Sequence, residues 1–86
     1  MPYTLRVAKS AEKAIDKLKK KDRQTYNEVL KKLDRIAIDP YHTGHPLHGK
    51  YSGSWETHIK NNVLVYRIDE NGKVVEVVQY IDHDLL

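Results

Sequence analysis

The chain has 86 residues, no cysteine, and 15 lysine and arginine residues against 12 aspartate and glutamate residues, which gives a formal net charge of +3 at neutral pH. This length suits one small domain, and the lack of cysteine excludes disulfides, thiolate metal sites and a cysteine nucleophile. The longest near-continuous apolar run, Val74 to Ile81, is too short and too often interrupted for a membrane helix or a signal peptide, so we expect a soluble, cytoplasmic protein.

The first half of the chain predicts one strand and two helices. Residues 3–7 alternate apolar and polar side chains, which indicates a short strand with one buried face. Ser10 is expected to cap a helix with apolar residues at positions 11, 14, 15 and 18. Asp22 is expected to cap a second helix, which ends before Asp39-Pro40. The short turn between them predicts a helical hairpin with lysine-rich exposed faces.

The second half changes to the two-residue period of strands. Strands are predicted over residues 55–60, 63–68 and 74–81, joined by turns at Asn61-Asn62 and at Asn71-Gly72. The last strand is rich in β-branched residues and is expected to lie inside the sheet, with the first strand beside it or at an edge. The predicted fold class is α+β, with the order β-α-α-β-β-β in a single domain of residues 1–86 and an antiparallel-rich sheet.

The helical hairpin is expected to cover one face of this sheet and to leave the other face open. A turn at Asn61-Asn62 sets the register of the first two meander strands. The expected opposite pairs are Glu56 with Arg67, His58 with Val65, and Lys60 with Val63. The open face would then display Glu56, His58, Lys60 and Arg67.

Three of the five histidines lie in the central loop, at His42, His45 and His48. Their spacing raises the hypothesis of a metal site, because histidine is a common metal ligand. However, Gly44 and Pro46 prevent a helix that would stack the rings, and no acidic residue lies within the run. No metal site is therefore predicted, and solvent-exposed loop histidines are the ordinary alternative.

The remaining histidines stand on or beside strands. His58 lies in the middle of a strand on the predicted open face, where a solvated residue or a partner of Glu56 is the alternative to a functional role. His83 follows the last strand and reaches the same face for only one of the two parities of the preceding hairpin, which the sequence does not fix. For Arg67 the alternative is a cross-strand ion pair with Glu56.

These side chains suit cleavage of RNA by its own 2′-hydroxyl. That reaction needs a base for the hydroxyl proton, an acid for the leaving 5′-oxygen and positive charge around the phosphorane. Two imidazoles can supply the base and the acid, each typically contributing about 10²–10⁴-fold in rate, and lysine or arginine can supply the charge. The reaction requires no metal ion.

One run of residues carries a resemblance to a known family. The run is His45-Pro46-Leu47-x-Gly49-x-Tyr51-x-Gly53, followed by Trp55-x-x-His58-Ile59 and later by Val63-Leu64-Val65-Tyr66-Arg67-Ile68. Together with the order of elements, it resembles the RelE/ParE toxin superfamily, and within it the YafQ-like messenger RNA endoribonucleases. The resemblance extends over nearly the whole chain.

The resemblance implies a ribosome-dependent messenger RNA endoribonuclease of a type II toxin–antitoxin system. Such a toxin needs no cofactor, contacts ribosomal RNA through its basic surface and is silenced by a cognate antitoxin protein. The catalytic histidines of YafQ-like members match His45, His58 and His83, with the acid and base roles left open.

Other family positions match less directly. The expected substrate contacts are Lys50, Lys60 and Arg67. The acidic residue that follows the strand histidine in the family is replaced here by Asn61-Asn62. The aromatic residue that often ends the family chain is absent, since this chain stops at Leu85-Leu86.

Two other functions remain open from the sequence. One is a catalytically degenerate member that only binds an antitoxin or RNA, and the other is a ParE-type inhibitor of DNA gyrase. The histidine set argues against the gyrase alternative.

Overall fold

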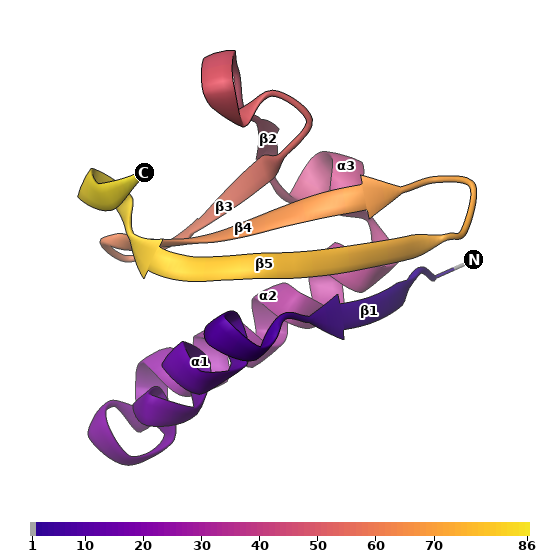
Figure 1. The fold of residues 1–86 in the computed structure, drawn as a ribbon. Coiled ribbons are helices and arrows are strands. Elements are labelled where there is room, and N and C mark those ends of the chain that lie inside the picture. Colours follow the sequence, from indigo (N-terminus) through magenta and orange to yellow (C-terminus); the bar gives the residue numbers. More distant parts are fainter. Residues whose placement is uncertain (1) are drawn as a thin grey trace.

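A computed structural model describes residues 2–86 as a five-stranded mixed sheet with two long helices packed on one face (Figure 1). The helices are α1 (Lys9–Lys21), α2 (Arg23–Ile38) and the short α3 (Pro40–Thr43). The strands are β1 (Thr4–Val7), β2 (His45–Pro46), β3 (Trp55–Ile59), β4 (Asn62–Asp69) and β5 (Val74–Asp82). Two single-turn 3₁₀ helices complete the fold, η1 (Gly49–Tyr51) and η2 (His83–Leu85).

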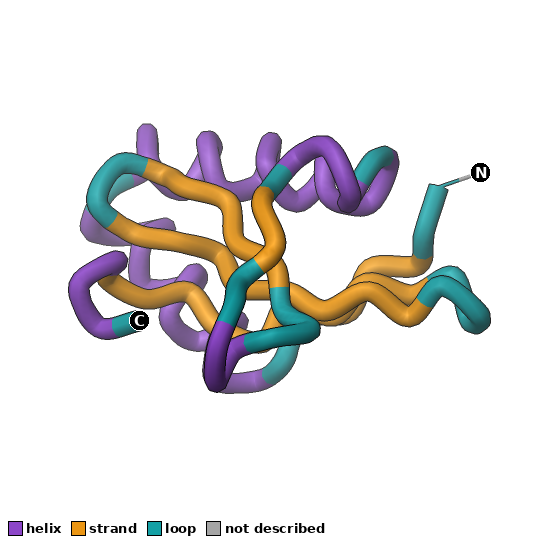
Figure 2. The backbone as a smooth tube through the Cα atoms, turned by 90° about the horizontal axis from the view of Figure 1, so that it is seen from above, coloured by secondary structure: helices purple, strands orange, loops and turns teal. Residues whose placement is uncertain are grey.

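The strand order is β1-β5-β4-β3-β2, with β1 parallel to β5 and every other pair antiparallel. The predicted α+β class and meander are confirmed, and β5 lies inside the sheet as expected. The turned view in Figure 2, like Figure 1, places the N-terminal segment beside the tip of the β4–β5 hairpin, where the Thr4 N–H donates to the Lys73 carbonyl. The sequence did not predict α3, β2, η1 or η2. Among residues 2–86, no helix has both the length and the apolar character needed to cross a bilayer.

The two long helices form because each has one apolar face that the sheet can bury. Ala11 and Ile15 of α1 are buried, as are Val29, Leu33 and Ile36 of α2. The predicted cap Asp22 is confirmed, since its carboxylate accepts the Thr25 N–H at 3.1 Å. The predicted cap Ser10 is wrong: α1 starts two residues earlier than that cap implies, at Lys9 after Ala8, and no side chain caps it.

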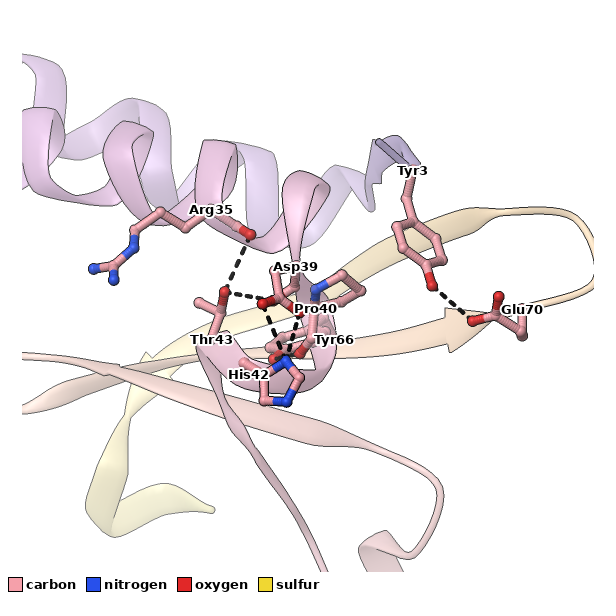
Figure 3. Close-up of polar contacts among 8 residues, drawn as sticks. All are labelled: Tyr3, Arg35, Asp39, Pro40, His42, Thr43, Tyr66 and Glu70. Atoms are coloured by element: carbon pink, nitrogen blue, oxygen red, sulfur yellow. Dashed lines mark hydrogen bonds and ion pairs between the residues drawn. The ribbon is translucent and has the colours of Figure 1, made fainter. Parts of the chain in front are cut away.

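The core between helices and sheet is centred on Tyr66, whose side chain is fully buried. Burial raises the pKa of Tyr66 to about 12, so its hydroxyl remains protonated at neutral pH and donates to the Pro40 carbonyl at 2.7 Å (Figure 3). The Thr43 hydroxyl, in turn, donates to the Asp39 carbonyl at 2.7 Å (Figure 3). These bonds fix α3 between the helical layer and the sheet, and thereby fix the point at which β2 begins.

The register of the β3–β4 hairpin differs from the prediction by two residues. The turn is made by Lys60 and Asn61, and Lys60 takes the positive φ of 57° that a tight turn needs. The observed opposite pairs are Glu56 with Val65, His58 with Val63, and Ile59 with Asn62. The predicted pairs of Glu56 with Arg67, His58 with Val65 and Lys60 with Val63 are therefore wrong. Because the shift is an even number, Glu56 and His58 still point away from the helices.

The β4–β5 hairpin closes through a four-residue loop, since Asp69 pairs with Val74. The predicted turn lies in the right place, but the residue with positive φ is Lys73, at 54°, rather than Asn71 or Gly72. Further along, Val65 pairs with Gln79 whereas Tyr66 pairs with Val77, so Val78 is an extra residue in β5. This β-bulge exchanges the faces of the residues that follow it.

The Glu70 carboxylate connects the hairpin tip to the residue that precedes β1 and to α3. It accepts hydrogen bonds at 2.7 Å from Tyr3 (Figure 3) and Tyr41, and it pairs with Lys73. Lys73 foremost, followed by the two tyrosine hydroxyls, lowers the pKa of Glu70 from 4.5 to about 2. A carboxyl whose folded-state pKa is depressed stabilises the fold above its unfolded pKa and loses that contribution as the pH falls.

We therefore expect Glu70→Gln to lower the melting temperature at neutral pH. The difference from the wild type should shrink as the pH falls from about 4.5 towards 2, because wild-type Glu70 then becomes neutral as well. Thermal unfolding followed by circular dichroism across this pH range measures the effect. Asp16→Asn, at an exposed position of α1, is the control. A difference that stays constant with pH would contradict this role of Glu70.

Candidate active site

Two imidazoles and one carboxylate meet on the sheet face that the helices leave uncovered. Glu56 and His58 come from alternate positions of β3, and His83 comes from η2 at the end of β5. His58 Nε2 lies 3.3 Å from Glu56 Oε1. The rings of His58 and His83 lie side by side, with centroids 5.0 Å apart and planes tilted by 40°. Residues far apart in the sequence thus form one cluster.

The bulge at Val78 brings His83 to this cluster. Without it, the pairing of Asp69 with Val74 would continue along β5 and direct His83 to the helical face. With it, Val63 pairs with Ile81, and the His83 N–H donates to the Asn61 carbonyl at 2.9 Å. Figure 1 accordingly shows η2 (yellow) at the same end of the sheet as the β3–β4 turn. The sequence left two parities open for this hairpin, and the structure has the one that brings His83 to the face of His58.

The floor of the cluster is apolar. Val63 and Val65 face away from the helical core yet are fully buried, because Glu56 and His58 flank them in β3 and residues of β5 flank them on the other side. The open face therefore combines polar side chains with two buried valines. An apolar floor lowers the local dielectric and strengthens the electrostatic interactions of the side chains above it.

Glu56 is the least exposed member of the cluster. Its side chain is 14% exposed, compared with 48% for His58. Its Oε2 atom is buried and has no hydrogen-bond partner among residues 2–86. Buried polar atoms without partners are uncommon, and they are often found where a protein binds a ligand. From the sequence, Glu56 was expected only as a partner of His58 or Arg67. Its place two residues before His58 in one strand was the signal for a shared site.

His45 stands in β2, directly opposite Glu56, and therefore on the same face as the cluster. Its position depends on two contacts of the preceding residues. The Thr57 hydroxyl donates to the Thr43 carbonyl at 3.2 Å. Gly44 lies so close to β3 that a Cβ atom there would be 2.3 Å from the Glu56 carbonyl oxygen. The structure thus places all three predicted catalytic histidines on one face, with His58 and His83 in contact and His45 one strand away.

The predicted substrate contacts lie in three different places. Lys50 is exposed in η1, with its ammonium 5.3 Å from the centre of the Tyr51 ring. Arg67 is exposed in β4, where it stands opposite Glu76 of β5 in the strand register and lines a hollow of about 400 Å³ together with Arg6.

Lys60, the third predicted substrate contact, points to the helical layer. Its ammonium donates to the Thr25 hydroxyl at 2.7 Å and lies 3.9 Å from Asp22, at the start of α2. The prediction that Lys60 stands on the face of His58 is therefore wrong, because this residue forms the turn instead of the strand.

The other loop histidines lie outside the cluster. His42 is on α3, where its Nδ1 atom lies 2.9 Å from Asp39 (Figure 3), and His48 is exposed just before η1. Within the described residues, the only three-residue group placed to ligate a metal ion is Glu56, His58 and His83, whose ligand atoms all lie within 4.8 Å of one another. His42, His45 and His48 are not part of another such group among residues 2–86.

This arrangement is suited to proton transfer next to an anion. When His58 is neutral, the ring nitrogen that faces a carboxylate carries the proton, so Nε2 donates to Glu56 and Nδ1 keeps its lone pair. The exposed ring of His83 lies beside it and can carry a second proton. One basic and one acidic imidazole can therefore act on the same substrate group.

Comparisons with known proteins agree on one family. A family described as "Bacterial toxin of type II toxin-antitoxin system, YafQ" matches residues 3–86. A protein of Methanocaldococcus jannaschii named as a toxin, RelE4, is 35% identical over 86 residues, which is 95% of this chain and 87% of that protein.

Solved structures share the fold. A copper-bound mutant toxin from Helicobacter pylori is 31% identical, with a TM-score of 0.68 and 98% coverage of each chain. A chain of the RelBE2 toxin–antitoxin complex from Mycobacterium tuberculosis is 23% identical, with a TM-score of 0.83, and the match covers 96% of this chain and 100% of that one.

Proposed function

The chain belongs to the YafQ family of toxins of type II toxin–antitoxin systems, and from this premise we propose that it is an endoribonuclease that cleaves messenger RNA on the ribosome. The observation that carries the proposal is the contact between His58 and His83 above an apolar floor, with Glu56 behind His58. A protein that only binds an antitoxin or RNA does not need two imidazoles in this geometry.

In the proposed reaction, His58 is the base. Its Nδ1 atom takes the proton of the 2′-hydroxyl, and the oxygen attacks the adjacent phosphorus. Glu56 supports this step, because its carboxylate orients the ring and stabilises the imidazolium that forms. The neighbouring imidazole of His83 protonates the leaving 5′-oxygen. The products are a 2′,3′-cyclic phosphate and a 5′-hydroxyl, and the step uses no metal ion.

The positive charge for the phosphorane and for the flanking phosphates is proposed to come from the same face. His45 lies beside Glu56, one strand from the imidazole pair, and is placed to donate to a non-bridging oxygen. Arg67 is four residues from Val63, the strand partner of His58, and so about 13 Å further along β4. It suits a phosphate one or two nucleotides away. Lys50 is exposed on the η1 turn, where its ammonium is open to a further phosphate.

Lys60 receives a different role. Its ammonium is already engaged by Thr25 and Asp22, so we assign it to the connection between the β3–β4 turn and the helices. The proposed substrate contacts are therefore Arg67, Lys50 and His45, with Lys60 acting through the position of the turn that carries Asn61. The Asn61 carbonyl holds the backbone of His83.

A cognate antitoxin is the second proposed partner. Matched structures include toxin–antitoxin complexes, among them the RelBE2 complex of Mycobacterium tuberculosis and a YoeB–YefM complex from Staphylococcus aureus. The basic exposed faces of α1 and α2 offer complementary charge to an acidic segment of such a protein. Binding there would be expected to weaken with added salt.

The experiment is induction of the chain in growing cells with primer extension on a reporter transcript. We expect new 5′ ends within the coding region, and none when the start codon of the reporter is removed, because cleavage requires translation. A tight complex with an antitoxin but no new ends would support the binding-only alternative. Inhibition of DNA gyrase in a supercoiling assay, without RNA cleavage, would support the ParE-type alternative.

A further inference from the structure

We propose that the hollow lined by Arg6, Arg67 and Glu76 binds one nucleotide of the RNA and selects guanine as its base. The subsite itself depends only on the geometry and charge of these side chains. Its place in the reaction, one or two nucleotides from the cut, rests on the proposed function, because it assumes that RNA is cleaved beside His58 and His83.

The three side chains form a row across neighbouring strands. Arg6 of β1 stands opposite Glu76 of β5 in the parallel register, and Glu76 stands opposite Arg67 of β4 in the antiparallel register (Figure 1). All three residues are exposed. Their neighbours Leu5 and Val75 pack in the helical core, so the row points to the opposite side. It therefore lies on the same sheet face as the proposed active site.

The charges of the row are not paired with one another. Although opposite charges stand in register, no ion pair joins Glu76 to either guanidinium among residues 2–86. The Arg67 guanidinium lies against the loop before β3, since a Cβ atom at Gly53 would be 3.5 Å from its Nη2. The hollow that these residues line measures about 400 Å³. Sites for small molecules in proteins usually measure about 300–1,000 Å³.

The mixture of charges favours a base over a phosphate at the centre of the hollow. Arg6 and Arg67 carry two positive charges, and Glu76 and Asp69, which also lines the hollow, carry two negative charges. Such a site gains little from an anion, but it can donate to and accept from a neutral group that offers both kinds of hydrogen bond. A nucleobase is such a group, and the unstacked bases of single-stranded RNA are bound on their edges and against guanidinium planes.

The Glu76 carboxylate distinguishes guanine from the other three bases. Its two oxygens accept two parallel hydrogen bonds, and only guanine offers adjacent donors, N1–H and N2–H, on its pairing edge. Adenine and cytosine place a ring lone pair beside the amino group, which repels a carboxylate, and uracil flanks its one donor with two carbonyls. Arginine is the commonest donor to O6 and N7 of guanine, and Arg6 stands beside Glu76 for that contact.

The length of the row suits one nucleotide. Neighbouring strands lie about 4.8 Å apart, so the backbones at Arg67 and Arg6, two strands apart, are separated by about 10 Å. A nucleotide whose phosphate contacts Arg67 can therefore extend its base over Glu76 and Arg6. This arrangement keeps the phosphate contact proposed above for Arg67. It also gives functions to Arg6 and Glu76, which the sequence did not indicate.

Binding is measured first, on the purified full-length chain without ribosomes. The chain is labelled with nitrogen-15 and titrated with guanosine 5′-monophosphate, and separately with the adenosine, cytidine and uridine monophosphates. We expect saturable amide shifts at Arg6, Arg67 and Glu76. The dissociation constant for guanosine monophosphate should be lower than the other three by about fivefold or more, the discrimination that a bidentate base contact gives. No saturable shift at these positions would overturn the subsite, and equal constants for all four nucleotides would overturn the selection of guanine.

Glu76→Gln tests the contact that selects the base. The substitution keeps the size of the side chain but replaces one acceptor oxygen with an amide donor. Guanosine monophosphate should bind about fivefold more weakly or worse, whereas adenosine monophosphate should gain, because glutamine bonds to adenine. Glu12→Gln, at an exposed position of α1, is the matched control and should bind as the wild type does. Thermal unfolding checks the fold of each variant, and an unchanged preference in folded Glu76→Gln would overturn the assignment of Glu76.

Cleavage then tests the place of the subsite in the reaction. Reporter transcripts carry each base in turn at the two positions on either side of the cut. Guanine at one fixed position should raise kcat/KM by about fivefold or more, chiefly through a lower KM, since the contact is made before and during the reaction. Glu76→Gln should lose this preference. Both proteins meet the same codons, so the ratio of their rates removes effects of decoding.

The outcomes separate this subsite from the proposed function. Cleavage without preference at these positions, or a preference that survives Glu76→Gln, would overturn the selection of guanine in the reaction. Binding of guanosine monophosphate in the hollow by a chain that cleaves no RNA would leave the subsite standing and reject the proposed function.

Discussion

Replacing either His58 or His83 with alanine is expected to reduce RNA cleavage by about 10²–10⁴-fold, the usual contribution of a positioned acid or base. The two rings are in contact, so each should be needed while the other is present. The double variant should be little worse than the poorer single variant, because groups that act in one step are not additive. Cleavage rates of a translated reporter, measured for the purified variants on programmed ribosomes, give these values.

The controls for this prediction are His42→Ala and His48→Ala. Both side chains are exposed and lie outside the cluster of Glu56, His58 and His83. Each control removes one imidazole, as His58→Ala and His83→Ala do. If the loss of any histidine lowered activity, the controls would therefore lose activity as well. Full activity of His58→Ala or His83→Ala, with the fold intact, would contradict the assignment of these residues.

Gly44→Ala is expected to damage both stability and activity. A Cβ atom at this position would lie 2.3 Å from the Glu56 carbonyl oxygen, a backbone atom that no side-chain rotation can move, and 2.5 Å from the hydroxyl of the fully buried Tyr66. Because the backbone must move, we expect a loss of about 1–3 kcal/mol in the free energy of unfolding, the usual cost of overpacking. The displacement would separate β2 from β3 and move His45 off the site face.

The matched control is Gly72→Ala in the β4–β5 loop. A Cβ atom there would meet the Asp69 carboxylate at 2.8 Å, but this is the end of an exposed side chain that can turn away. Denaturant unfolding of both variants measures the difference, and cleavage assays below the melting temperature measure the effect on His45. Equal stability of the two variants would show that β2 does not approach β3 as closely as described.

Much of the fold could be predicted from local patterns. The helix stripes, the Asp22 cap and the β-branched third meander strand each depend on neighbouring residues, and each appears in the structure. The register could not be predicted as well. Lys60 adopts a positive φ that asparagine ordinarily favours, because its ammonium is held by Thr25 and Asp22 in the helical layer. A tertiary contact thus moved the turn by one residue.

The candidate site was predicted in part for the same reason. His58 could be placed on the open face, since alternation within one strand determines it. The position of His83 beside His58 depends on the bulge at Val78. A run of β-branched residues does not indicate where such a bulge lies. The contact between Glu56 and His58 was also open to prediction, since the two residues stand at alternate positions of β3 and their neighbourhood does not depend on the β3–β4 register. Contacts within one strand were predictable, and contacts between strands were not.

The central claim is cleavage through the 2′-hydroxyl, and the chemical ends of the products test it most directly. After mapping the cleavage site on a ribosome-bound transcript, the upstream fragment is analysed for its 3′ end and the downstream fragment for its 5′ end. The proposed mechanism predicts a 2′,3′-cyclic phosphate and a 5′-hydroxyl, and no cleavage when the nucleotide before the cut carries a 2′-deoxyribose. A 5′-phosphate on the downstream fragment, or undiminished cleavage of the deoxy transcript, would contradict it.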